Sequence, residues 1–304
     1  MRAGVSGGLL LRCNMEQQSL PSQVTLVECP RDAMQGWPSF IPTEVKTSYL
    51  NQLLRVGFDV LDFGSFVSPK AIPQMADTKA VLQGLDLTGT ETKLLAIVAN
   101  TRGAEDAAAF EEIHFLGFPF SISETFQQLN TNKSIEASLA QVAQMQDLCV
   151  QKNKELVVYI SMGFGNPYGD PYHPDIAAHW VEQLAGMGIR TIALADTVGM
   201  ADAAAISSLF RTLIPAFPEV HFGAHFHAAP DDWEEKIAAA WQAGCRRYDS
   251  ALKGIGGCPM AQKALVGNMA TENLVGWLTE KKIPLRLNQE ALSEALQTAG
   301  AIFH

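Results

Sequence analysis

LVVYISMGFGNPYGDPYHPDIAAHWVEQLAGMGIRTIALAD, residues 156–196, is the stretch of this sequence that decides the fold. It begins with a short apolar run (156–162) and ends with another (191–196), both typical of buried β-strands. Between them, residues 173–188 carry apolar side chains at i, i+3 and i+4, the spacing of an amphipathic helix. Gly188 follows this helix, where a left-handed residue is favoured. The stretch therefore predicts a strand, a helix and a second strand.

The same unit recurs along the chain. Strand-like runs lie at 24–29, 60–67, 93–100, 113–120, 156–162, 191–196, 220–227 and 246–252, with amphipathic stretches between them. Eight strands alternating with helices over about 250 residues predict an α/β fold, a (β/α)8 or TIM barrel. A doubly wound open sheet is the alternative. An additional C-terminal helix at about 288–302 is expected outside the barrel or across its mouth. We expect one catalytic domain over 23–304, preceded by a disordered extension over 1–22.

Composition limits the partners. The chain has 304 residues and a formal net charge of −10, which disfavours nucleic acid or an anionic membrane as a partner. No apolar run approaches the ~18 residues of a membrane span. Five scattered cysteines without a CxxC pair indicate a reducing compartment, so we expect a cytoplasmic protein. Arg2 and Arg12, near the start of the chain, leave organellar import as the alternative.

Polar side chains gather where the predicted strands end, which is where such a barrel carries its chemistry. His225 and His227 are two residues apart at the end of the seventh strand, so both imidazoles face one side of it. Asp32 follows the first strand and Asn268 follows the eighth. Nitrogen and oxygen donors of this kind suit Mg2+ or Mn2+, with Zn2+ as an alternative. A hydrogen-bonded pair of structural histidines is the competing interpretation.

Other polar residues at the strand ends have two interpretations each. Arg31, next to Asp32, forms either a surface ion pair or a fork of donors for a carboxylate or developing enolate. Asp62 is either an acid or base, or an acceptor that orients a histidine or arginine. Lys70 and Asn100 are candidates for binding substrate near the mouth.

The segment KGIGGCPMAQ, residues 253–262, surrounds Cys258 with glycines. It does not satisfy GxGxxG, because a proline occupies the last glycine position, so it does not indicate a dinucleotide site. A glycine-rich segment after the eighth strand can close over a bound substrate. A thiol of ordinary pKa, about 8.5, is mostly protonated at neutral pH, so Cys258 could act as a general acid. An inert cysteine is the alternative.

These residues occur in segments that resemble the hydroxymethylglutaryl-CoA lyase family. The segments are VECPRDAMQ, SFVSPKAIPQMAD, SETFQQLNTNKSIEAS, ADTVGM, HFH, GIGGCPMAQ and GNMATENLV, in family order from about 24 to 278. The RD and HFH motifs mark metal-dependent barrel lyases and Claisen-type synthases in general, whereas GxGGCP and SFVSPK single out the lyase.

The resemblance implies cleavage of 3-hydroxy-3-methylglutaryl-CoA, an acyl-CoA substrate, to acetyl-CoA and acetoacetate by a retro-Claisen reaction. It implies metal ligands at Asp32, His225, His227 and Asn268. It also implies that Arg31 stabilises the enolate, that Cys258 protonates the acetyl-CoA carbanion, and that Asp196 lies near the substrate hydroxyl. A homodimer is common in this family.

Three departures from the family lie close to the site. Asp62 stands where the family usually has glutamate, AAPDD follows HFH in place of Asp-Thr-Tyr-Gly, and one extra residue lies between Cys258 and Asn268. The departures leave a longer or branched 3-hydroxyglutaryl-CoA open as substrate. Two other functions remain: a Claisen-type acyltransferase that condenses a 2-oxo acid with acetyl-CoA, and a non-catalytic thioester-binding barrel.

Overall fold

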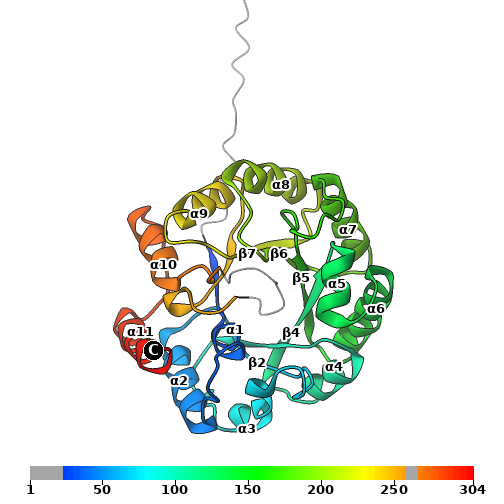
Figure 1. Cartoon of the computed structure of the whole chain (residues 1–304). Helices are drawn as coiled ribbons and strands as arrows, with labels where there is room; N and C mark the ends of the chain where they lie inside the picture. Colours follow the sequence, from blue (N-terminus) through cyan, green and yellow to red (C-terminus); the bar gives the residue numbers. More distant parts are fainter. Residues whose placement is uncertain (1–22, 258–265) are drawn as a thin grey trace, which may run out of the picture.

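The computed structural model describes residues 23–257 and 266–304, so the extension expected over 1–22 lies outside the described residues. Within these ranges, eight strands close into a parallel barrel in sequence order, with β8 paired to β1 (Figure 1). The strands are β1 Thr25–Glu28, β2 Val60–Ser65, β3 Lys93–Ile97, β4 Ile113–Ser121, β5 Glu155–Ser161, β6 Thr191–Asp196, β7 His221–Phe226 and β8 Arg247–Ser250. The (β/α)8 prediction is confirmed, and the open-sheet alternative is wrong.

Helices surround the barrel (Figure 1). They are α1 Pro30–Gln35, α2 Thr43–Val56, α3 Thr78–Gln83, α4 Thr101–Ala108, α5 Glu124–Thr131, α6 Ile135–Gln151, α7 Pro174–Gly186, α8 Ala203–Ala216, α9 Trp233–Gln242, α10 Thr271–Glu280 and α11 Gln289–Ile302, with 3-10 turns η1 Pro73–Met75 and η2 Leu252–Gly254. In the deciding stretch, His173 caps α7 and Gly188 follows it with a φ of +87°. None of the helices in the described ranges is long and apolar enough to cross a membrane.

Two apolar clusters hold the barrel together. Because side chains alternate along a strand, one set faces the helices and the other faces the barrel axis. On β1, Leu26 joins the large outer cluster and Val27 joins a small inner one. Leu95, Tyr159 and Ala193 from other strands complete much of that inner cluster. The barrel is therefore a packed core and not a pore.

The C-terminal helix α11 packs outside the barrel, against α2 and η2 (Figure 1). Asn288 caps it by accepting backbone N–H groups from Glu290 and Ala291. Phe303, just beyond the helix, makes an edge contact with the ring of Trp37, with centroids 5.2 Å apart. Of the two positions expected for this helix, the structure has the outer one.

Several strands end earlier than their apolar runs predict. β3 stops at Ile97, and Asn100 caps α4, because its Oδ1 accepts the Gly103 N–H at 2.9 Å. β1 stops at Glu28, and Pro30, which has no N–H for the ladder, begins α1. Residues expected at strand ends therefore lie in the turns and helices above them.

Candidate active site at the carboxyl ends of the strands

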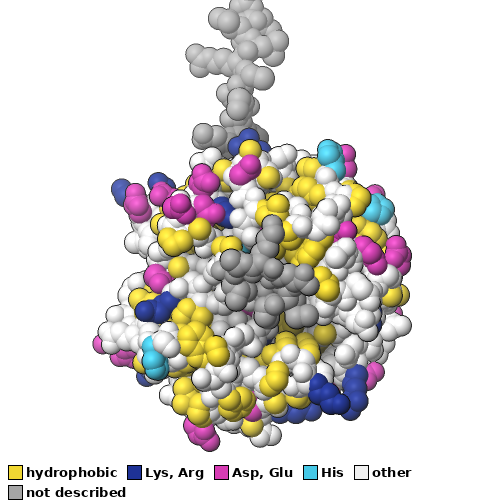
Figure 2. Space-filling model, in the orientation of Figure 1, with side chains coloured by type: hydrophobic (Ala, Val, Ile, Leu, Met, Phe, Trp, Pro, Cys, Tyr) yellow, Lys and Arg dark blue, Asp and Glu magenta, His cyan; other side chains and the backbone are white. Residues whose placement is uncertain are grey.

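Helix α1 directs two charged side chains into the barrel mouth. Arg31 and Asp32 lie in its first turn, and they are only 7% and 6% exposed. The interpretation of these two residues as a surface ion pair is therefore wrong. Figure 2, which shows the mouth from outside, has charged side chains mainly around the rim, whereas the charges of α1 lie beneath the surface.

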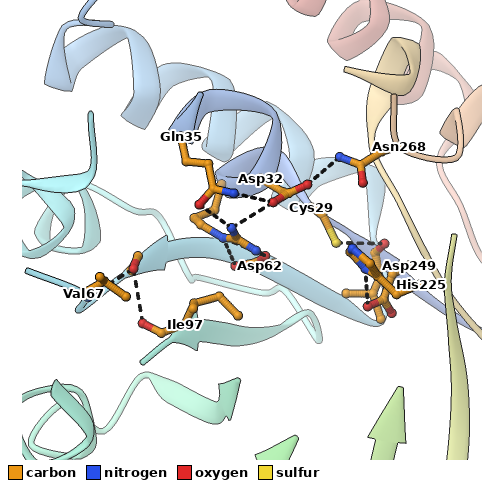
Figure 3. Close-up of polar contacts among 12 residues, drawn as sticks. Cys29, Asp32, Gln35, Asp62, Val67, Ile97, His225, Asp249 and Asn268 are labelled. Atoms are coloured by element: carbon orange, nitrogen blue, oxygen red, sulfur yellow. Dashed lines mark hydrogen bonds and ion pairs between the residues drawn. The ribbon is translucent and has the colours of Figure 1, made fainter. Parts of the chain in front are cut away.

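The Arg31 guanidinium organises a network of carboxylates (Figure 3). Its Nε and Nη2 donate to Asp62 Oδ2 at 3.0 and 2.6 Å, and its Nη1 donates to Asp32 Oδ1 at 3.0 Å. Gln35, one turn along α1, accepts from Nη1 at 2.8 Å and donates to Asp32 Oδ1 at 2.7 Å. Gln35 was not predicted from the sequence, although its i+3 and i+4 spacing from the charged pair was the signal.

The pKa values of the two carboxyl groups shift in opposite directions. Burial raises the pKa of Asp62 to about 6, although the charge of Arg31 opposes this. Burial also acts to raise the pKa of Asp32, but the charge of Arg31 and the nearby histidines outweigh it, so the pKa is lowered. Asp32 is therefore a carboxylate at neutral pH, whereas Asp62 titrates close to neutral pH.

The two histidines are neighbours, with ring centroids 5.5 Å apart. His225 Nδ1 lies 3.2 Å from Asp249 Oδ2, and His227 Nδ1 lies 3.1 Å from the Val266 carbonyl oxygen. A carbonyl or carboxylate oxygen only accepts, so each Nδ1 carries the hydrogen and each Nε2 keeps its lone pair in the neutral ring. This is the tautomer that a histidine needs to bind a metal through Nε2.

The charge states of the two imidazoles differ. Burial lowers the pKa of His227 to about 4, and the neighbouring His225 adds to this, so His227 is neutral at physiological pH. Burial also acts to lower the pKa of His225, but its hydrogen bond to Asp249 and the charges of Asp249 and Asp32 outweigh that effect and raise it. A cation in the site would compete with that proton.

Asn268 reaches the site because the chain returns along β7. Residue 268 forms an antiparallel bridge with His227, and the Met269 N–H donates to the Phe226 carbonyl at 3.0 Å. The Asn268 Nδ2 donates to Asp32 Oδ2 at 2.7 Å and to the Ile255 carbonyl at 2.9 Å. With its amide nitrogen engaged, the amide offers its oxygen as a ligand.

The glycines beside Cys258 allow this close packing. Gly256 has a φ of +109°, and a Cβ there would lie 2.5 Å from Asn268 Nδ2 and 3.0 Å from the Asp32 carbonyl oxygen. The absence of a side chain at Gly256 therefore leaves room for the Asn268 side chain to pack against α1. Cys258 itself lies outside the described residues.

Two sets of donors could hold a metal ion, and they share His225. The first is the predicted set of Asp32, both histidines and Asn268. The second is Cys29, His225 and Asp249, whose ligand atoms lie within 4.8 Å of one another. Burial and the surrounding carboxylates raise the pKa of the Cys29 thiol, which makes it a poor ligand. Asp249 accepts from Arg247 and lies against His225 Nδ1, and the poor thiol ligand is what makes the first set fit a cation better.

Asp196 is joined to the histidine strand through a lysine. Its Oδ1 accepts the N–H groups of Met200 and Ala201 at 2.8 and 3.1 Å, and its Oδ2 accepts Lys236 Nζ at 3.0 Å. Lys236, only 1% exposed, also donates to the His227 carbonyl at 2.9 Å. Lys236 was not predicted from the sequence, because a lysine in the helical pattern of α9 resembles any solvent-exposed helix residue.

The two predicted substrate-binding residues stand apart from this buried network. Lys70 is exposed in the loop after β2, and the Asn100 side chain caps α4. A cavity of about 1730 Å³ lies at the opposite, amino end of the barrel. Residues that begin the strands line it, including Thr25, Lys93 and Thr191, and charges of both signs surround it. It contains none of the residues predicted for catalysis.

Known proteins resemble this chain over nearly its whole length. The family model described as HMGL-like matches residues 23–299. A hydroxymethylglutaryl-CoA lyase of Bacillus subtilis is 34% identical over 279 residues, 90% of this chain and 91% of the relative. An (R)-citramalyl-CoA lyase of Chloroflexus aurantiacus is 31% identical over 282 residues, 90% of this chain and 88% of the relative. The solved HMG-CoA lyase of Acinetobacter baumannii, in complex with coenzyme A and 3-methylmalate, superposes with a TM-score of 0.86 at 31% identity, covering 93% and 92% of the two chains.

The structure is a closed parallel barrel, and histidine and carboxylate donors lie at the carboxyl ends of its strands. These two features define a class of protein, the (β/α)8-barrel enzymes with donors suited to a divalent cation. The chain belongs to the HMGL-like family and is a carbon–carbon lyase of the oxo-acid-lyase type. The family resemblance found in the sequence is confirmed.

Proposed function

We propose that this protein cleaves 3-hydroxy-3-methylglutaryl-CoA, or a close 3-hydroxyglutaryl-CoA analogue, within one barrel domain over residues 23–304. The bond between the α-carbon of the thioester and the carbon bearing the hydroxyl breaks. The hydroxyl loses its proton and becomes the ketone of acetoacetate. The electron pair of the broken bond passes to the thioester as an enolate, which takes up a proton to give acetyl-CoA. Membership of the HMGL-like family and the named lyase relatives support this reaction.

The observation that carries the proposal is the pair of imidazoles whose Nδ1 atoms are both hydrogen-bonded, beside the Asp32–Asn268 contact. We assign Asp32, His225, His227 and Asn268 to a divalent cation, Mg2+ or Mn2+, with Zn2+ as the alternative. Such a cation, when bound, polarises the substrate oxygens and favours loss of the hydroxyl proton.

Arg31 is the proposed donor to the enolate oxygen. A guanidinium has five N–H groups. The contacts of Arg31 with Asp62, Asp32 and Gln35 engage Nε, one hydrogen of Nη2 and both hydrogens of Nη1. One Nη2 hydrogen remains for a developing negative charge. Asp62 fixes the guanidinium by accepting hydrogen bonds from Nε and Nη2. The Asp62 pKa of about 6 suits proton transfer near neutral pH.

Two further roles follow from the family resemblance. Asp196 is assigned to the substrate hydroxyl, and Cys258 is assigned as the acid that protonates the acetyl-CoA carbanion. Asp196 already accepts hydrogen bonds from Lys236 and from two backbone N–H groups. These bonds favour a role in which Asp196 orients the substrate hydroxyl, and they disfavour a role as a free base.

The coenzyme A part of the substrate is assigned to the rim beside α3 and α4, where Figure 2 shows Lys and Arg side chains gathered. Lys70, Lys79 and Arg102 are exposed in this region, and cations suit the phosphates of coenzyme A. We also propose a homodimer and a cytoplasmic location. The free thiols of Cys29, Cys149 and Cys245 agree with a reducing compartment.

A second candidate substrate is (R)-citramalyl-CoA, favoured by the relative from Chloroflexus aurantiacus. The same bond cleavage on this shorter acid gives acetyl-CoA and pyruvate.

One experiment separates these functions. The protein is treated with a chelator, dialysed, and assayed with each thioester before and after addition of Mn2+, following acetoacetate and pyruvate. Faster formation of acetoacetate supports the first substrate, and faster formation of pyruvate supports the second. If neither product forms, or if chelation has no effect on either rate, the proposed reaction or its metal dependence is wrong. Release of free coenzyme A from acetyl-CoA and a 2-oxo acid would instead identify a condensing transferase.

A further inference from the structure

An arginine lies inside the barrel beneath the candidate metal site. Arg247 and Asp249 are two residues apart on β8, so both side chains point toward the barrel axis. Arg247 is 7% exposed, and its Nη1 donates to Asp249 Oδ1 at 2.6 Å. The other oxygen of Asp249 lies 3.2 Å from His225 Nδ1 (Figure 3). A continuous chain of charged contacts thus runs from the barrel floor to a proposed metal ligand.

The neighbouring strand makes room for this arginine. Gly223 on β7 pairs in register with Arg247. A Cβ at residue 223 would lie 2.9 Å from Arg247 Nη1 and 3.3 Å from Cγ and Cδ. A glycine is therefore needed at this place for the guanidinium to reach Asp249, because any side chain would occupy its path.

We propose that Asp249 and Arg247 are positioning residues that fix the ring of His225 so that its Nε2 faces the cation. This inference rests on the proposed function, in which His225 is a metal ligand. Asp249 holds the ring at Nδ1, and the ring of Tyr159 packs edge-on against it, with centroids 5.5 Å apart. Together these two contacts define both the plane and the direction of the imidazole.

Arg247 acts on His225 through Asp249 in this arrangement. A carboxylate inside a barrel is costly unless it is paired, and it can rotate unless both oxygens are engaged. The arginine engages Oδ1 and leaves Oδ2 directed at the imidazole. Removing the arginine frees the carboxylate to turn away from His225, and the ring loses its fixed direction.

Direct ligation by Asp249 is the competing arrangement, because Cys29, His225 and Asp249 lie close enough to share one ion. The two arrangements predict different effects at Cys29. If Asp249 positions the histidine, the thiol has no part in binding. If Cys29, His225 and Asp249 share one ion, the thiol is a ligand too.

The test measures Mn2+ affinity of the chelator-treated full chain by the electron paramagnetic resonance signal of free Mn2+. Asp249→Asn and Arg247→Met are expected to weaken Mn2+ binding by about 10- to 100-fold, as is typical for loss of a hydrogen bond to a ligating histidine. Arg246→Met is the matched control. This neighbouring arginine stacks on Trp241 at 3.7 Å and donates to backbone carbonyls, and its removal should leave the affinity unchanged. Cys29→Ala should also leave it unchanged.

Substitution with Co2+ provides a spectroscopic readout that does not depend on activity. The proposal predicts no thiolate-to-cobalt charge-transfer band in the wild type. A band that disappears in Cys29→Ala would show direct ligation and overturn the proposal. Wild-type affinity in folded Asp249→Asn and Arg247→Met would overturn it as well.

If a single variant does not fold, the double variant Arg247→Met/Asp249→Asn, which removes both buried charges, takes its place with the same expected loss. Wild-type affinity in that double variant also overturns the proposal. Absence of Mn2+ binding by the wild type would contradict the proposed metal site itself, and the positioning roles with it. Tight wild-type binding without cleavage of either thioester would overturn only the proposed substrate.

Discussion

Gly256→Ala is expected to disturb the site without replacing any proposed ligand, because the new side chain would press on Asn268. A Cβ at this residue would lie 2.5 Å from Asn268 Nδ2, whereas ordinary contacts are 3.4 Å or longer, so the amide must retreat by about 1 Å. Its 2.7 Å bond to Asp32 and 2.9 Å bond to the Ile255 carbonyl then lengthen beyond hydrogen-bonding distance. Asn268 would no longer be held as a ligand beside Asp32.

The cost has two parts. A side chain at a φ of +109° costs about 1–2 kcal/mol, because L-residues are strained there. Loss of one charge-assisted and one neutral hydrogen bond adds about 2–4 kcal/mol. We therefore expect a loss of about 3–6 kcal/mol in the free energy of unfolding, together with at least tenfold weaker Mn2+ binding.

Gly89→Ala isolates the backbone part. Gly89 also has a positive φ, +73°, but no atom lies within 4 Å of the place that its Cβ would take. This control should lose only about 1 kcal/mol and keep its Mn2+ affinity. Both variants are compared by urea unfolding and by titration with Mn2+. If Gly256→Ala matches the control in both measurements, the packing role assigned to this glycine is wrong.

Three further predictions concern buried groups and the loop. Lys236→Met removes the cation that pairs with the buried Asp196, and it should lower the free energy of unfolding by about 3–5 kcal/mol. The control Arg55→Met removes an exposed ion pair and should change the free energy of unfolding by about 0.5 kcal/mol or less. Equal effects of the two substitutions in urea unfolding would contradict this prediction. Burial raises the pKa of Glu28 from 4.5 to about 8, so the folded chain holds this proton where the unfolded chain has lost it. The contribution of Glu28 to stability is complete below pH 4.5 and falls by up to roughly 5 kcal/mol as the pH rises to about 8. Glu28→Gln should flatten this pH dependence when the free energy of unfolding is measured at several pH values. An unchanged pH dependence would refute the raised pKa of Glu28. Cys258→Ala should reduce turnover by about 100-fold or more with unchanged unfolding, and near-normal turnover would exclude the thiol as the acid.

Local patterns were sufficient to predict the fold. The apolar run and the helical spacing of residues 156–196 repeat along the chain, and the geometric consequence of eight such units is a closed barrel. The common direction of His225 and His227 was also predictable, because the side-chain period of a strand is two. Arg31 and Asp32 were placed at the right end of the barrel, after the first strand, but the short helix that begins at Pro30 and carries them was not predicted.

The amino-acid sequence by itself thus determined the barrel, the family and the donor types at its mouth, because these depend on periodicity and on short motifs. Only the tertiary structure decided which atoms meet. The contacts of Asp249 with His225, of Lys236 with Asp196 and of Asn268 with Asp32 join residues that are 24, 40 and 236 positions apart. Such contacts depend on the register in which strands pair and on the closure of β8 against β1, and no local pattern in the chain records either.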